Sequence, residues 1–229
     1  MSMPTFIINF NMKTWPEAML PHIRRMGGRP IIIDNHSTAP ETLAWYETRP
    51  CEVIQLAENY GHRAPWVTGI VQQYCPNYYA VTDPDLDLAG VPDEALQHLR
   101  NGLDRFPFIT KCGLSLEIND LPDESIVKTK ALAWESPFWL KRFDWQFWDA
   151  PIDTTLAVYD GRRGYHPDRF LTAARADRPF TFRHLPFYLT EANMTEELFN
   201  YFTAALGESA TLATHLEPML RQWKERQKK

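Results

Sequence analysis

The chain has 229 residues, of which 44% are hydrophobic and 23% charged, and its net charge is −5. This is the composition of a globular protein with a full core, and it excludes a disordered chain. It also argues against a nucleic-acid-binding protein, because such proteins usually carry a basic excess. Neither a long apolar run nor a basic, cleavable leader is visible, so we expect a cytoplasmic protein without a transmembrane segment.

The first part of the chain alternates short apolar segments with amphipathic ones. Predicted strands occupy residues 5–10, 30–33 and 52–56, and a fourth begins at residue 78. Predicted helices occupy residues 15–26, 40–48 and about 64–74. This alternation is typical of βαβ units and therefore predicts a parallel sheet.

Past residue 91 the pattern changes to a mixture of helices and more widely spaced strands. Helices are expected over residues 92–106, 123–134 and 196–206, with a last helix through residues 212–223. Strands are expected over residues 109–118, 152–159 and 180–189, with an arginine-rich, turn-like stretch over 161–178. Since no linker or repeat interrupts the chain, we predict a single α/β domain over 1–229. Its fold class is a Rossmann-like, mostly parallel central sheet flanked by helices, with an antiparallel C-terminal part.

Polar residues follow each of the first four predicted strands. They include Asn9, Asp34, Asn35, the segment from Asn59 to Arg63, and Asp83 with Asp85. Ligands of open α/β sheets bind beyond the carboxyl ends of the strands, where these residues are expected to gather. The sequence therefore predicts a binding site on this rim.

The acidic residues after the fourth strand are the most informative part of the rim. Asp83, Asp85 and Asp87 stand at alternate positions, and Pro84 prevents a helix from continuing through them. Grouped oxygen ligands of this kind suit Mg²⁺ or Mn²⁺, and the ion in turn suits a diphosphate. The alternatives are a polar turn whose acids cap the next helix, and an Asp87 that the alternation turns away from the other two acids.

These motifs resemble those of the GT-A-fold glycosyltransferases, in particular the small family-2-like enzymes. Residues 31–37 resemble the strand whose acidic end, here Asp34, holds the nucleotide base or ribose. Residues 59–64 resemble the N-x-G-x-x-A motif that opens the next helix, and residues 83–85 fall at the place of the D-x-D motif. The chain departs from the family in lacking a clear E-D pair before a helix, where the catalytic base often lies.

The resemblance implies a transferase that moves a sugar from a nucleotide-diphosphate donor, such as a UDP-sugar, to a glycan or glycolipid-type acceptor, with inversion. Residues 1–90 would form the nucleotide-sugar half, and residues 91–229 the acceptor half. The implied donor-binding residues are Asn9, Asp34, Asn35, Asn59, Gly61, Arg63 and Asp83. Asp83 and Asp85 would bind Mn²⁺ or Mg²⁺, with the late histidine His184 as a third ligand. Two alternatives remain open: an Asx turn between Asp34 and Ser37 without ligand binding, and a structural role for His184.

An inverting transferase also needs a carboxylate that takes the proton of the acceptor hydroxyl. The candidates are Glu135, Asp153 and Asp120, and Glu135 is preferred because aromatic residues flank it. The aromatic stretch over residues 134–148 is a candidate sugar-stacking platform, and core packing or a dimer patch explains it equally well.

Two other functions compete with a glycosyltransferase. A sugar nucleotidyltransferase shares a related sheet, but it normally opens with a glycine-rich loop, and residues 9–14 contain no glycine. A nucleotide- or carbohydrate-binding module without catalysis would explain the missing E-D pair. Finally, a basic C-terminus predicts peripheral contact with anionic lipid, or else a solvated helix end. Its basic residues are Arg221, Lys224, Arg226, Lys228 and Lys229.

Overall fold

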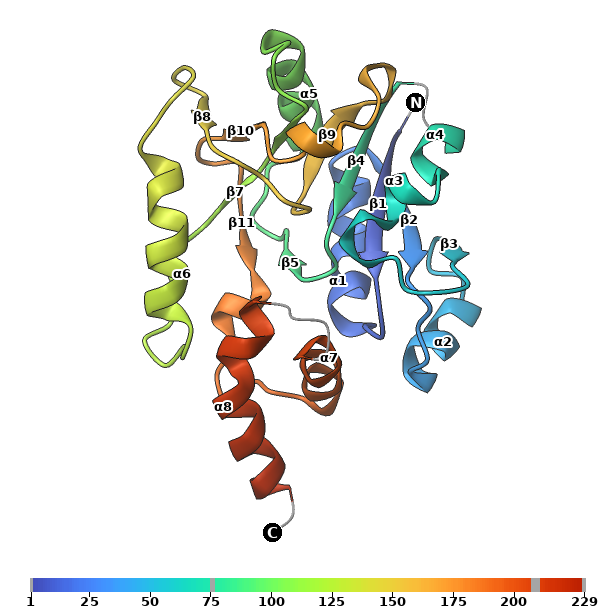
Figure 1. Ribbon diagram of the computed structural model, residues 1–229, viewed down its shortest axis with the longest axis vertical. Helices are drawn as coiled ribbons and strands as arrows, with labels where there is room; N and C mark the ends of the chain where they lie inside the picture. Colours follow the sequence, from blue (N-terminus) through green and yellow to red (C-terminus); the bar gives the residue numbers. More distant parts are fainter. Residues whose placement is uncertain (1, 75–76, 207–210, 228–229) are drawn as a thin grey trace.

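The computed structural model describes residues 2–74, 77–206 and 211–227 of the chain. It has an α/β architecture in which helices flank an eight-stranded, mostly parallel sheet, and a three-stranded sheet adjoins it (Figure 1). The predicted fold class is therefore confirmed. The division of the chain into a nucleotide half and an acceptor half stays a prediction.

The first four strands form the parallel part of the large sheet, in the order β3-β2-β1-β4. They are β1 (Met3–Asn9), β2 (Gly28–Asp34), β3 (Glu52–Gln55) and β4 (Tyr78–Thr82). The helices between them are α1 (Thr14–Arg25), α2 (Pro40–Glu47), α3 (Ala64–Val67) and α4 (Ile70–Tyr74). One continuous helix over 64–74 was a wrong prediction, because Gly69 adopts a φ of +75° and ends α3.

The second part of the large sheet mixes strand directions. Strand β9 (Ala157–Asp160) lies between β4 and β6 (Lys111–Gly113) and runs antiparallel to both. Beyond β6 follow β10 (Ala173–Ala176), parallel to it, and the antiparallel edge strand β8 (Phe147–Asp149). The turn-like stretch over 161–178 was a wrong prediction, because β10 lies inside it, and β8 was not predicted.

The small sheet brings three distant segments together. Its strands are β5 (Leu86–Asp87), β11 (Thr181–His184) and β7 (Ser115–Leu116), in that order. The predicted strand over 109–118 is thus divided, with β6 in the large sheet and β7 in the small one. His184 pairs with Leu86 across β11 and β5, so the small sheet carries this histidine to the acidic loop that follows β4.

The remaining helices surround the two sheets (Figure 1). They are α5 (Ala95–Arg105), α6 (Lys128–Glu135), α7 (Glu196–Leu206) and α8 (Thr211–Arg226). Helices α6 and α2 lie at opposite sides of the molecule, and α8 extends away from the sheets toward the C-terminus. Among the described residues, no helix is both long and apolar enough to cross a membrane.

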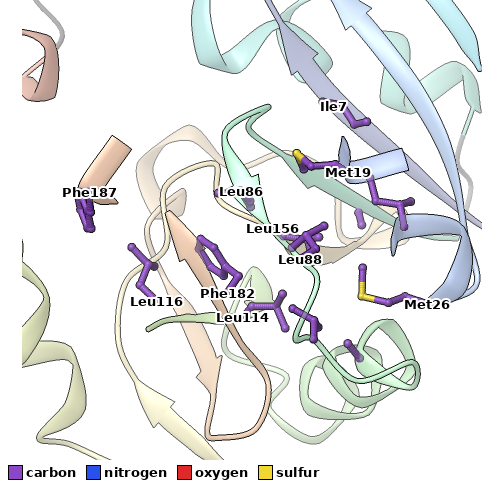
Figure 2. Packing of buried hydrophobic residues seen from close by; sticks show 14 of the residues in the cluster. Ile7, Met19, Met26, Leu86, Leu88, Leu114, Leu116, Leu156, Phe182 and Phe187 are labelled. Atoms are coloured by element: carbon purple, nitrogen blue, oxygen red, sulfur yellow. The ribbon is translucent and has the colours of Figure 1, made fainter. Parts of the chain in front are cut away.

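Two apolar clusters fill the faces of the large sheet. The larger one extends into the small sheet, where Leu86, Leu116 and Phe182 join the same cluster as Ile7 of β1 (Figure 2). This continuous burial holds the small sheet against the large one, since apolar area removed from water is the main stabilising contribution to folding. The position of the small sheet in turn fixes β5 and β11 beside the end of β4.

Candidate functional site

The ends of β1 and β2 form a polar network around Asp34 and Asn9, in which only the Asn9 Oδ1 atom is buried without a hydrogen-bond partner among the described residues. Asp34 is buried, and its carboxylate accepts hydrogen bonds from the Ser37 backbone N–H, the Ser37 hydroxyl and the Tyr46 hydroxyl. Asn9 donates to the Met12 carbonyl at 2.6 Å and to the Tyr46 hydroxyl at 2.7 Å. The Asx turn with Ser37, which the sequence left open, is what the structure has. We therefore do not place Asp34 in the proposed site, and the donor-binding role of Asn9 stays a prediction.

The Asn35 side chain anchors the loop after β3 through two hydrogen bonds. Its amide donates to the Gly61 carbonyl at 3.0 Å, and its side-chain oxygen accepts from the Tyr60 N–H at 3.2 Å. The Asn59 side chain accepts from the Gly61 N–H at 2.8 Å, and Gly61 has a φ of +67° that glycine adopts without strain. Asn35 is thus a buried residue that anchors the loop, while Asn59 is exposed on the rim.

Arg63 follows this loop and is half-buried. Its guanidinium carbon lies 5.1 Å from the centre of the Phe170 ring, and its buried Nε atom has no hydrogen-bond partner within the protein. Guanidinium groups are common partners of anionic groups such as phosphate.

The acidic loop after β4 has carboxylates that are only partly satisfied, unlike the carboxylate of Asp34. The Asp85 Oδ2 atom lies 3.3 Å from Nε2 of His184, and Asp83 accepts a hydrogen bond of 2.9 Å from the Thr154 hydroxyl. The Asp85 Oδ1 and His184 Nδ1 atoms are buried without any hydrogen-bond partner in the protein. Buried polar atoms are paired in the great majority of proteins, so these two are exceptions that require an explanation.

The electrostatics of the loop reflect two carboxylates held close together. Burial and the neighbouring charge of Asp85 raise the pKa of Asp83 to about 7. Burial lowers the pKa of His184, but the attraction of Asp85 outweighs it, so the net shift is upward. The third acid, Asp87, has turned away: it accepts from the Ala89 N–H and pairs with Arg183 at 3.4 Å.

Asp83, Asp85 and His184 fit a divalent cation in chemical type. Two carboxylates and an imidazole are a donor set that Mn²⁺ accepts, and the two unpartnered buried atoms belong to members of this set. Their arrangement is not a closed cage: within the described ranges, no group of three or more His, Cys, Asp or Glu side chains is arranged to hold a metal. The metal site remains a proposal.

A cavity of about 700 Å³ opens at this loop. Asp83 and His184 belong to its wall, and every other lining residue comes from residues 116–187. The volume is within the range of small-molecule sites, and such sites combine apolar walls with a few polar groups. The cavity therefore lies where the acidic loop meets the second half of the chain.

The three candidate bases occupy different environments. Glu135 lines the cavity but is 3% exposed, and its Oε2 atom lies 2.6 Å from the guanidinium of Arg175. Asp153 also lines the cavity, with a 64% exposed side chain and a contact of 4.0 Å to Nε2 of His62. Asp120 is not a lining residue; hydrogen bonds from Tyr188 and Arg183 outweigh its partial burial and lower its pKa.

Sequence reasoning missed three residues of this region. Thr154 follows the candidate base Asp153 in the chain, but no role was predicted for it. Arg175 stood in the stretch interpreted as turns, so its burial in β10 was not expected. Lys111 is fully buried and donates to the Asp153 carbonyl, and a charged residue inside a strand pattern was the only available signal.

The aromatic stretch over residues 134–148 separates into three groups. Trp134 and Phe138 line the cavity. Phe143, Phe147 and Trp148 contribute to buried packing, and Trp139 contacts Trp148 at a ring distance of 5.5 Å. Trp145 is 76% exposed and is not a lining residue. Two of the predicted platform residues thus reach the cavity, and core packing explains most of the others.

Comparisons with known proteins leave the family open. No protein-family model and no curated protein matches the sequence. Solved structures do match, and one of them is titled "Crystal structure of 4-diphosphocytidyl-2C-methyl-D-erythritol synthase". It shares 12% sequence identity over 90% of this chain and 86% of that chain, with a TM-score of 0.36. A likeness at this level identifies neither a family nor an activity.

Proposed function

We propose that this protein is a metal-dependent glycosyltransferase that uses a nucleotide-diphosphate sugar as donor. The observation that carries the proposal is the partly satisfied cluster of Asp83, Asp85 and His184 beyond the carboxyl end of a parallel strand, with Asp83 and His184 lining the cavity. Sites on such sheets are found at this place. The order of motifs along the sequence supports the same function.

In this proposal Asp83, Asp85 and His184 hold Mn²⁺ or Mg²⁺. The bound ion would stabilise the negative charge of the departing diphosphate. Thr154 orients the Asp83 carboxylate through its 2.9 Å hydrogen bond, so the ligand geometry depends on the segment before β9. Arg63, Asn59 and Gly61 on the neighbouring loop are the residues proposed for the nucleotide diphosphate.

Asp153 is the proposed catalytic base. It lines the cavity together with Asp83, and its carboxylate is largely exposed, so an acceptor hydroxyl can reach it. Glu135 lines the same cavity, but a buried arginine already binds its carboxylate. A base in that pairing would have to give up its interaction with Arg175 as it took a proton, which makes Glu135 the weaker candidate.

The experiment is a calorimetric titration of UDP with and without Mn²⁺, on the natural protein and on two variants. Asp85→Ala removes a proposed ligand, while Asp87→Ala is the matched control, because Asp87 is two residues further along the chain and pairs with Arg183 of β11. We expect Asp85→Ala to lower the Mn²⁺-dependent affinity about 100-fold or more. Asp87→Ala should leave it within about twofold. Unchanged affinity in Asp85→Ala would contradict the metal site.

Activity assays distinguish the competing functions. Release of UDP from a panel of UDP-sugars, dependent on Mn²⁺ and lost in Asp153→Asn, is the result expected of the proposed transferase. Release of pyrophosphate from a nucleoside triphosphate and a sugar phosphate would instead indicate a nucleotidyltransferase. Tight binding of UDP without any turnover would indicate a binding module.

A further inference from the structure

The cavity has two chemically different parts. Asp83, Asp153 and His184 form its polar part, next to the proposed metal site. The rest of the wall is dominated by large apolar side chains from β7, α6, the segment before β10 and the turn after β11. They include Leu116, Val127, Trp134, Phe138, Leu171 and Phe187.

The apolar wall extends from the core to solvent. Leu116, Val127 and Phe187 are buried, whereas Trp134 is 70% exposed and Leu171 is 55% exposed. Large apolar side chains that are exposed at the edge of a cavity commonly mark a binding site. A ligand with an apolar body would remove both Trp134 and Leu171 from water.

Two charged groups of this wall, Glu135 and Arg175, are buried and paired with one another, and the third, Lys130, is exposed. Glu135 and Arg175 form a buried ion pair of 2.6 Å, and the Arg175 Nε atom also donates to the Pro151 carbonyl at 2.8 Å. The Arg175 guanidinium carbon lies 4.5 Å from the centre of the Phe138 ring. A glycan chain presents many hydroxyl groups, each of which needs a hydrogen-bond partner, and a wall of this composition offers few.

We infer that the acceptor of the proposed transferase is a hydroxyl compound with an apolar aryl or alkyl body, not a polar glycan chain. The apolar body would contact Trp134, Leu171 and Phe138, and its hydroxyl would face Asp153. This inference rests on the proposed function, and it narrows the acceptor class that the sequence left as a glycan or a glycolipid. A cavity of about 700 Å³ suits a small molecule.

The test uses four glucosides or glucans that differ in the apolar group. The probes are p-nitrophenyl β-D-glucopyranoside and octyl β-D-glucopyranoside below its micelle concentration, with methyl β-D-glucopyranoside and maltotriose as polar references. Calorimetric titrations are made in the presence of UDP and Mn²⁺. We expect the aryl or the octyl probe to bind at least about tenfold more tightly than both references.

Variants locate the binding within the cavity. Trp134→Ala and Leu171→Arg should each lower the affinity for the apolar probe about tenfold or more. Their matched controls are Trp145→Ala and Leu140→Arg, since these side chains are 76% and 81% exposed and do not line the cavity. The controls should stay within about twofold, and circular dichroism checks that all four variants are folded.

Either of two results would overturn the inference: polar references that bind as tightly as the apolar probes, or an affinity that Trp134→Ala leaves unchanged. Titration with UDP and Mn²⁺ alone separates this failure from a failure of the proposed function. If UDP binds and the apolar probes do not, the acceptor inference is wrong and the donor site stands. If the apolar probes bind and UDP does not, the cavity is an apolar site and the transferase proposal is wrong.

Discussion

Two acidic strand ends on the same rim have opposite chemical states. At the end of β2, Asp34 accepts hydrogen bonds from Ser37 and Tyr46 and is enclosed by them. After β4, Asp85 and His184 share one contact, and each keeps a buried atom without a partner. Both segments have the sequence pattern of an apolar strand followed by an acid. What separates a structural acid from a candidate ligand is the supply of donors around it, which neighbouring elements determine.

The largest expected effect comes from removing one member of the buried ion pair between Glu135 and Arg175. Glu135→Ala leaves the guanidinium of Arg175 buried without its partner, so we expect the free energy of unfolding to fall by about 3–5 kcal/mol in urea denaturation. The double variant Glu135→Leu with Arg175→Met should recover most of this loss. A loss of stability in the double variant as large as in the single one would argue against a paired state.

A second test concerns the enclosed acid at the end of β2. Asp34→Ala removes the acceptor of Ser37 and Tyr46, which remain buried, and should lower the free energy of unfolding by roughly 2–3 kcal/mol. Because Asp34 faces protein donors, we expect the affinity for UDP with Mn²⁺ to stay within about twofold. A large loss of affinity in a variant that remains folded would reverse the comparison and return Asp34 to the donor site.

A third test measures how the stability of the protein depends on pH through Asp83. The pKa of Asp83 is raised from 3.8 to about 7 by burial and by Asp85, so the folded state binds more protons than the unfolded state between these values. Without metal, stability should therefore fall as the pH rises from about 4 to about 7, by on the order of 1 kcal/mol or more. Asp83→Asn should flatten this fall in chemical denaturation series. An equally steep fall in the variant would assign it to another group.

The smallest expected change in stability near pH 7 is that of a Lys111 variant. The pH dependence that Lys111 contributes has the opposite sign to that of Asp83. Burial lowers the pKa of Lys111 from 10.5 to about 7, so the unfolded state binds more protons between these values, and stability should rise with pH across that window. Lys111→Met should remove the rise and change stability near pH 7 by only about 1 kcal/mol, since a lost hydrogen bond offsets the gain. A persistent rise between pH 7 and pH 10 would contradict the assignment.

Local patterns were sufficient to predict the parallel half of the fold. Strands β1, β2 and β4 followed from apolar runs, because their buried residues are consecutive in sequence. The later half was harder, since β8 has three residues and β10 contains a buried arginine that reads as polar. Both strands depend on partners far along the chain, and short sequence windows do not contain that information.

The site was predictable in composition but only partly in arrangement. Asp83, Asp85 and His184 do gather at one place, because β5 and β11 pair in the small sheet. The satisfaction of Asp34 by Tyr46 and of Glu135 by Arg175 required tertiary contacts 12 and 40 residues apart. Neither spacing has a local signature. Their roles as metal ligands and as donor-binding or catalytic residues stay predictions.

The reversed direction of β9 has a consequence for where chemistry can be assembled. Its neighbours β4 and β6 end at the rim where Asp83 lies, whereas β9 begins there. The chain just before it, with Asp153 and Thr154, consequently meets the tip of β4. Had β9 run the other way, four residues of strand at about 3.3 Å each would separate these side chains from Asp83 by roughly 13 Å. Because β9 is antiparallel, the segment that precedes a strand lies at this rim. In an all-parallel sheet, only the segments that follow the strands would lie there.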